Sequence, residues 1–193
     1  MTNEYRSLVL AAGEKYRLVP FDVSFTEALF EAAHESRNEL IRFVPWYYPE
    51  YSMEDARRWL QGRERKRFEG RSYDFAITDA KNGELIGGCG IDRIQSENRL
   101  GNLYYWVRTS QTNKGAATAA ASVIAKFGLT TLNLIRLEIV VAETNFVGQS
   151  VAEKIGASRE IRLPNRLILE GQILHAYMFS LLGKNTETAD SVD

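Results

Sequence analysis

Residues 103–127 hold the clearest candidate for ligand chemistry in this chain. An aromatic, apolar stretch is followed by a polar turn and then by an alanine-rich segment that begins at Gly115. The first composition is typical of a strand and the last of a helix. A helix that starts with small residues presents unpaired N–H groups and a partial positive charge to an approaching anion. We predict an anion site at Gly115, with phosphate as the usual guest. A strand–turn–helix that binds nothing is the alternative.

Two common phosphate motifs are excluded by the spacing around this turn. Lys114 precedes Gly115, whereas the lysine of a P-loop follows its glycine. The second and third glycines of a dinucleotide fingerprint are absent. The turn is therefore neither a P-loop nor a dinucleotide fingerprint.

The order of three sequence blocks resembles that of the GCN5-related N-acetyltransferases, the GNAT superfamily. The blocks are Tyr105-Trp106-Val107 with residues 113–118, residues 142–145 with the helix up to Gly156, and residues 171–182. The likeness is greatest to the bacterial Rim-type enzymes that acetylate the N-termini of ribosomal proteins. It covers residues 16–182, nearly the whole chain.

The resemblance implies acetyl-CoA as cosubstrate and no metal. The residues that it assigns to cofactor binding are Trp106, Val107, Thr112, Asn113, Lys114, Gly115, Ala116, Ala117, Thr118 and Asn145. Relatives often carry Arg or Gln at the position of Thr112 and Gly at that of Asn113. Asn145 would contact the CoA arm, cap the following helix, or do both.

The expected reaction is attack of an amine on the thioester carbonyl. An N–H group of the strand near Trp106 and Val107 would face the developing oxyanion. The candidate catalytic side chains are Ser150, Tyr105 and Glu143: the first two as proton donors and the third as base, directly or through water. Relatives often carry glutamate at the position of Asn102 and serine at that of Gly148.

The acceptor class follows from the lack of an obvious strong base. At pH 7 roughly a tenth of an N-terminal amine is neutral, against well under a thousandth of lysine. A protein N-terminal α-amine is therefore the preferred acceptor. A small amine such as a polyamine, drug or amino acid is an alternative. A non-catalytic acyl-CoA-binding module is another.

Composition limits the remaining function classes. The chain has 193 residues with a net charge of −1, which gives no support for nucleic-acid binding through bulk charge. A single cysteine rules out an intrachain disulfide and fits a reducing compartment. No signal peptide or membrane-length apolar run is visible. We expect a cytoplasmic protein without membrane contact, and a homodimer stays open.

The element pattern predicts a mixed α+β fold in one domain, residues 1–183, with a polar tail at 184–193. Strands are expected at 5–11, 16–21, 73–78, 84–94, 100–107, 135–141, 157–163 and 173–182. Helices are expected after a Ser24–Glu27 capping box, from Ser52 to Gly70, from Gly115 and over 146–155. The strands at 103–107 and 135–141 should run parallel, because a helix joins them. The resemblance implies that they splay apart around acyl-CoA.

Three further segments have two interpretations each. The aromatic stretch at 37–49 would contact a substrate or fill the core. The arginine-rich helix after Ser52 would present a solvated face or steer an anionic ligand. The glycine-rich run at 87–90 lies in an expected strand, where glycine often marks the close approach of another group.

Overall fold

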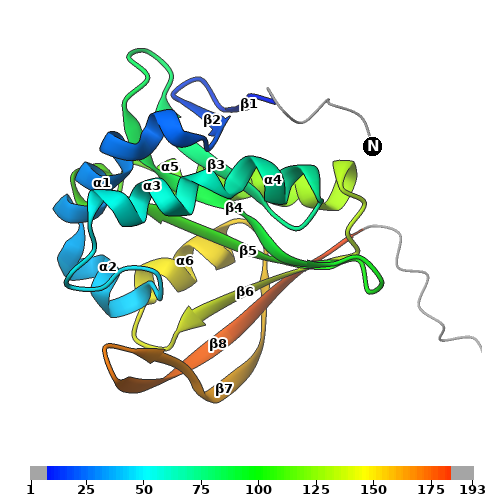
Figure 1. Ribbon diagram of the computed structural model, residues 1–193. Helices are drawn as coiled ribbons and strands as arrows, with labels where there is room; N and C mark the ends of the chain where they lie inside the picture. Colours follow the sequence, from blue (N-terminus) through cyan, green and yellow to red (C-terminus); the bar gives the residue numbers. More distant parts are fainter. Residues whose placement is uncertain (1–7, 184–193) are drawn as a thin grey trace, which may run out of the picture.

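A computed structural model describes residues 8–183, which form one eight-stranded mixed sheet with helices on both faces (Figure 1). The strands are β1 (Leu10–Ala12), β2 (Tyr16–Pro20), β3 (Tyr73–Asp79), β4 (Leu85–Gln95), β5 (Leu100–Val107), β6 (Arg136–Ala142), β7 (Ser158–Leu169) and β8 (Gln172–Leu182). Their order across the sheet is β1-β2-β3-β4-β5-β6-β8-β7. The mixed α/β architecture is thus confirmed. The predicted tail lies outside the described residues.

The helices divide between the two faces of the sheet. They are α1 (Thr26–Glu35), α2 (Arg37–Phe43), α3 (Met53–Gln61), α4 (Arg63–Phe68), α5 (Ala116–Lys126) and α6 (Phe146–Lys154), with short 3₁₀ turns at Val23–Phe25 and Thr109–Gln111 and a π-helical turn at Phe127–Thr131. On β3, Phe75 packs in the core beneath α5 and α6, whereas Ala76 packs in a second core beneath α1 and α3. Successive strand residues point to opposite faces, so one strand serves both cores.

Strands β5 and β6 open into a V. They pair in parallel only at their starts, where Asn102 lies opposite Glu138. Beyond that point β5 keeps its pairing with β4, and β6 keeps its pairing with β8. The predicted parallel, splayed pair is confirmed, and the gap between the two strands ends at Asn102 (Figure 1).

The glycines of β4 make room for two aromatic rings. A Cβ atom at Gly88 would lie 2.6 Å from Trp106 Nε1, and one at Gly90 would lie 2.9 Å from the Tyr104 hydroxyl. Real Cβ atoms do not approach that closely. These glycines therefore let Trp106 and Tyr104 lie flat over β4, on the face that α1, α3 and α4 cover.

Two expected helix boundaries are wrong. Ser24 does not cap α1: its N–H donates to Asp22 Oδ1 at 2.8 Å, so Asp22 caps a 3₁₀ turn that precedes the helix. The expected helix from Ser52 to Gly70 is two helices, because α3 ends at Gly62 and α4 begins after it. Glycine lowers the cost of such a break.

The last strand pair is longer than its composition indicates. The sequence predicts that this strand ends at residue 163, before Pro164, but β7 continues to Leu169. The register between β7 and β8 shifts between Leu163 and Leu167, so a bulge accommodates the proline. β7 is also an edge strand, where a missing N–H costs no ladder hydrogen bond.

Two arginines of α4 are not solvated, contrary to the simpler interpretation of this helix. Arg63 and Arg67 are only 9% and 6% exposed. Arg63 Nη1 lies 3.4 Å from Asp74 Oδ2, and the Tyr104 and Ser72 hydroxyls also donate to that carboxylate, each at 2.7 Å. A buried polar cluster therefore lies beneath α4, next to the closed end of the V.

No cluster of three or more His, Cys, Asp or Glu side chains that could hold a metal occurs among residues 8–183. Over the same range, no helix is both long and apolar enough to cross a membrane.

Candidate functional site

The turn between β5 and α5 adopts a conformation suited to its residues. Gly115 has φ +84° and Asn113 has φ +61°. Both lie in the left-handed region, where glycine is unstrained and asparagine is among the best tolerated other residues. Asn113 is therefore a residue type that adopts the conformation of this turn with little strain.

The N–H groups of residues 113–118 donate to no acceptor within the described range 8–183. The flanking N–H groups are used: Thr112 donates to Thr109 O at 3.2 Å, and Ala119 donates to Gly115 O at 3.0 Å. Between them, no hydrogen bond from these amides is present among residues 8–183. The space at the Gly115 Cβ position is also empty to 4 Å. Converging free donors at a helix N-terminus fit a pyrophosphate.

The turn is held in place by the end of α1. The Arg108 guanidinium binds Glu35 and also Glu84, the latter at 3.0 Å. The Ser110 N–H donates to Glu35 Oε1 at 2.8 Å. Burial raises the pKa of Glu35, but the hydrogen bonds from Arg108 and Ser110 outweigh it and bring that pKa down to about 2. Because α1 faces the other side of the sheet, this contact links the two faces.

The Glu35 contact predicts a pH response at Ser110. A pKa lowered from the ordinary 4.5 to about 2 means that ionised Glu35 stabilises the fold above pH 4.5 and that this contribution is lost as the pH falls toward 2. The Ser110 amide resonance should titrate with a midpoint near pH 2 in NMR spectra. A Glu35→Gln variant is the control and should show no such titration. A midpoint at 4.5 would contradict the contact.

Side chains of the turn also bond to one another. Lys114 Nζ donates to Gln111 Oε1 at 3.0 Å, and the Tyr16 hydroxyl donates to Lys114 O at 3.0 Å. The Thr112 hydroxyl donates to Thr109 O at 2.9 Å. These side-chain bonds hold the turn without using the N–H groups of residues 113–118.

The N–H groups of successive β5 residues point to opposite sides of the strand, so two of them point into the V. Arg108 N–H donates to Ile86 O on β4 at 2.8 Å. In an antiparallel pair every second residue bonds to the same neighbour, so Trp106 also directs its N–H toward β4. Tyr105 and Val107 direct theirs toward the open edge. Of the two residues predicted to offer an oxyanion donor, Val107 has this orientation, whereas Trp106 contributes an indole that is 8% exposed.

Tyr105 connects the two sides of the V. Its hydroxyl donates to Gly148 O on α6 at 2.7 Å, and burial raises its pKa, so it stays protonated. Ser150 is half-buried on the same helix. Asn145 caps that helix, since its Oδ1 accepts from the Gly148 N–H at 2.9 Å. A Cβ atom at Gly148 would lie 2.8 Å from Asn145 Nδ2, so a larger residue there would require the Asn145 side chain to shift.

Glu143 is bound by an arginine. Both of its carboxylate oxygens accept from Arg162, at 2.9 and 2.8 Å, and the Tyr177 hydroxyl donates to it at 3.1 Å. The hydrogen bonds from Arg162 lower its pKa to about 2. A carboxylate held in this way is a weak base, so its predicted catalytic role gains no support from its surroundings.

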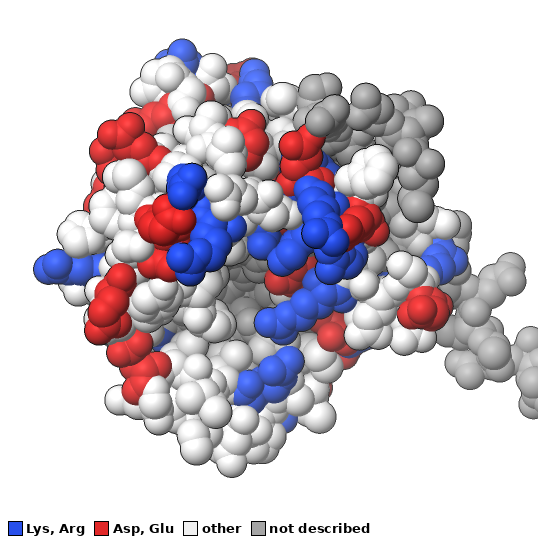
Figure 2. Space-filling model, viewed as in Figure 1, with Lys and Arg blue, Asp and Glu red and all other residues white. Residues whose placement is uncertain are grey.

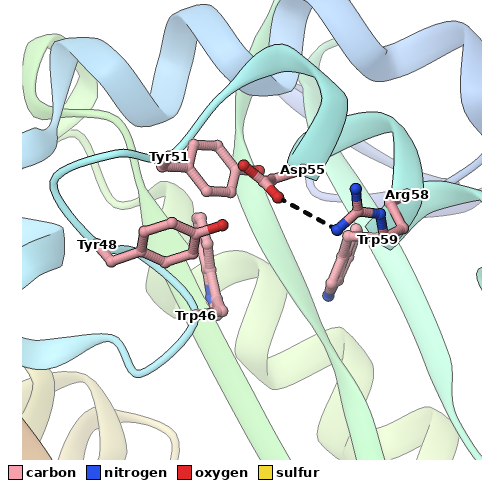
Figure 3. Close-up of a pocket in the computed structure, with 6 residues that line it drawn as sticks. All are labelled: Trp46, Tyr48, Tyr51, Asp55, Arg58 and Trp59. Carbon is pink, nitrogen blue, oxygen red and sulfur yellow. Dashed lines mark ion pairs between the residues drawn. The ribbon is translucent and has the colours of Figure 1, made fainter.

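A cavity of about 250 Å³ opens on the face of the sheet that α1 and α3 cover (Figure 3). Its lining residues are Trp46, Tyr48, Tyr51, Asp55, Arg58 and Trp59. Asp55 lies between the two tyrosines and Arg58 and is 3.7 Å from Arg58 Nη1. Figure 2 shows the same face hollowed near its centre, with Lys and Arg side chains gathered along the rim.

The aromatic segment contributes both to the core and to the lining of this cavity. Tyr47 is buried at 7% exposure, whereas Trp46 and Tyr48 line the cavity. The Trp46 ring lies 5.6 Å from the Trp106 ring, centroid to centroid. The cavity is therefore adjacent to the strand that borders the V.

Asp92 is an acidic residue near the V that the sequence alone does not indicate. Asn102 Nδ2 donates to Asp92 Oδ1 at 2.7 Å, next to the closed end of the V. The two residues lie directly opposite each other on β4 and β5. Counting back through that hairpin from Asn102 would have identified Asp92, but the bulge before Gln95 shifts the register.

Comparisons with known proteins agree with this geometry. The family model described as "Acetyltransferase (GNAT) domain" matches residues 16–158. A Bacillus licheniformis protein named "Uncharacterized N-acetyltransferase p20" is 31% identical over 114 residues, which cover 59% of this chain and 64% of that protein. The chain spans less than two thirds of the curated relatives it matches.

Solved structures share the fold at low identity. The ribosomal-protein-S5-alanine acetyltransferase of Vibrio fischeri has a TM-score of 0.85 at 16% identity, over 94% of this chain and 100% of that one. A ribosomal L7/L12 α-N-protein acetyltransferase in complex with coenzyme A has a TM-score of 0.85 at 18% identity, over 91% and 98%. The family match covers well over half of the sequence, and the chain belongs to the GNAT family of acetyltransferases.

Proposed function

We propose that this protein transfers an acetyl group from acetyl-CoA to the α-amine of a protein N-terminus. The observation that carries the proposal is the row of free N–H groups at residues 113–118, beside the V between β5 and β6. A pyrophosphate bound there would place the reactive end of acetyl-CoA in the V. Acetyl-CoA supplies an activated thioester carbonyl for an uncharged amine to attack.

The residues around the V have separate tasks in this proposal. The Val107 N–H donates to the carbonyl oxygen as negative charge develops on it, and removal of such a donor typically costs about 2.7–4 kcal/mol. Tyr105 keeps its hydroxyl protonated near the leaving sulfur. Its bond to Gly148 O fixes the position of that hydroxyl. Ser150, which lies on α6 together with Gly148, is a second proton donor.

The aromatic cavity supports a peptide acceptor over a polyamine. A polyamine bound in this cavity would need uncompensated negative charge in its lining, yet the acidic lining residue Asp55 lies beside Arg58 and accepts hydrogen bonds from Ser52. The rest of the lining is aromatic, which suits an apolar or flat side chain. Solved relatives of the same fold are named as ribosomal-protein acetyltransferases, which agrees with this acceptor class.

Acetyl transfer to matched peptides tests the proposal. One peptide has a free N-terminus and no lysine; the other has a blocked N-terminus and one internal lysine. At pH 7 we expect thiol release with the first and at least about a tenfold lower kcat/KM with the second, since far less lysine is neutral. Equal rates would contradict the acceptor class. Acetyl-CoA binding without transfer to either peptide or to spermine would favour the non-catalytic module.

A further inference from the structure

Asp92 and Asn102 form a pair on the face of the sheet that also carries the aromatic cavity. They are directly opposite residues of β4 and β5, and Asn102 Nδ2 donates to Asp92 Oδ1 at 2.7 Å. Asn102 is also the last residue of β5 that pairs with β6. The carboxylate therefore lies beside the point where the V closes. Asp92 Oδ2 accepts no hydrogen bond from any residue of the described range 8–183, and Asp92 is only partly buried.

Other carboxylates near the V are bound by arginines. Glu143, which follows β6, forms an ion pair with Arg162 on β7 at a shortest distance of 2.8 Å. Glu138, opposite Asn102 on β6, lies 2.9 Å from Arg136 Nε. Within residues 8–183 Asp92 forms no ion pair, and its one partner is a neutral amide. Among these groups Asp92 is the one whose charge is not already neutralised.

The surroundings of Asp92 also raise its basicity. Burial raises the pKa of Asp92, and the nearby Asp74 carboxylate on β3 acts in the same direction. The Asn102 hydrogen bond and the charges of Arg93 and Arg63 oppose the rise without cancelling it. The other titratable groups next to this pair are Tyr104 on β5 and Glu138 on β6. A carboxylate with a raised pKa accepts a proton more readily from an amine near neutral pH.

We propose that Asp92 is the proton acceptor for the amine substrate and that Asn102 positions it. This rests on the proposed function. The proton passes from the ammonium nitrogen to Asp92 Oδ2 through a chain of water molecules, because the Val107 N–H lies about 16 Å along β5 from Asn102. The freed lone pair forms the C–N bond as the C–S bond breaks. The departing thiolate takes its proton from the Tyr105 hydroxyl, the second amine proton restores that hydroxyl, and Asp92 returns its own proton to solvent. The carboxylate thus lies on β4, across from the β5 position that Asn102 occupies.

Replacement of Asp92 by Asn tests this role with little change of shape. A lost general base lowers kcat/KM by about 100-fold or more. The double variant Asp92→Asn/Asn102→Glu moves the carboxylate across the pair and should recover at least tenfold of that loss. Glu138→Gln is the matched control, because it removes the carboxylate on the other side of Asn102; its activity should stay within about threefold of the parent.

The pH profile separates proton transfer from a structural effect. Without the base, the amine must lose its proton to bulk water, so the rate should fall about tenfold per pH unit below the amine pKa of about 7.7–8.0. The parent should show a flatter profile down to the pKa of Asp92. The activity ratio of parent to Asp92→Asn therefore grows as the pH falls from 8 to 6. A constant ratio would overturn the proposal.

A measurement without turnover keeps the two proposals distinguishable. The Asp92 carboxyl can be titrated by carbon-13 NMR in the whole protein, with Asp92→Asn used for assignment. We expect a pKa above the usual value of about 3.9. A pKa at or below that value overturns the role of Asp92 whether or not the protein acetylates. A raised pKa with no transfer to any amine would overturn both proposals, since a base without a reaction has no role.

Discussion

Replacement of Gly115 by Trp should weaken acetyl-CoA binding by more than about 100-fold. The Gly115 Cβ position faces open space in front of the free N–H groups of residues 113–118. An indole there would occupy the volume of the bound phosphates. Loss of two charge-assisted hydrogen bonds at about 1.5 kcal/mol each corresponds to about 3 kcal/mol, and 1.4 kcal/mol is a factor of ten.

Calorimetric titration with acetyl-CoA measures this effect, and Gly171→Trp is a matched control. Gly171 has φ +71° and open space at its Cβ position, so the same substitution introduces similar backbone strain. It lies in the turn between β7 and β8, away from α5. We expect the control to bind acetyl-CoA like the parent. Equal binding by Gly115→Trp and the parent would remove the phosphate site from this turn.

The local part of this site could be predicted from sequence because it is contiguous. Strand β5, the polar turn and α5 follow one another, and Gly115 marks the helix start by its residue type alone. The parallel direction of β5 and β6 follows from the helix that joins them. The splay itself came from family resemblance, because no residue pattern in either strand requires the pairing to end at Asn102.

The contacts that support the site could not be predicted, because their partners are distant in sequence. Glu35 and Arg108 are 73 residues apart, and neither residue type indicates its partner. The burial of Arg63 and Arg67 has the same origin. The sequence of α4 is strongly polar and predicts a solvated helix. In the structure, however, Arg63 forms an ion pair with the buried Asp74 on β3, so one face of α4 is buried. Side-chain charge indicates solvent exposure only when no buried counter-charge is within reach.

That buried counter-charge leads to the second large prediction, which concerns stability. Asp74 is 2% exposed and accepts hydrogen bonds from Tyr104, Ser72 and Arg63. Asp74→Ala would leave the Arg63 guanidinium buried without its carboxylate. Removal of one partner from a buried pair typically costs about 3–5 kcal/mol. We expect the free energy of unfolding to fall by that amount.

Urea unfolding followed by circular dichroism measures the loss, with Glu54→Ala as the control. Glu54 pairs with Arg57 on the exposed face of α3, so its removal should leave the unfolding midpoint unchanged. The slope of the unfolding free energy against urea concentration should be unchanged. That result would show that Asp74→Ala alters stability and not the surface exposed on unfolding. A loss below about 1 kcal/mol would mean that Arg63 reaches solvent when Asp74 is removed.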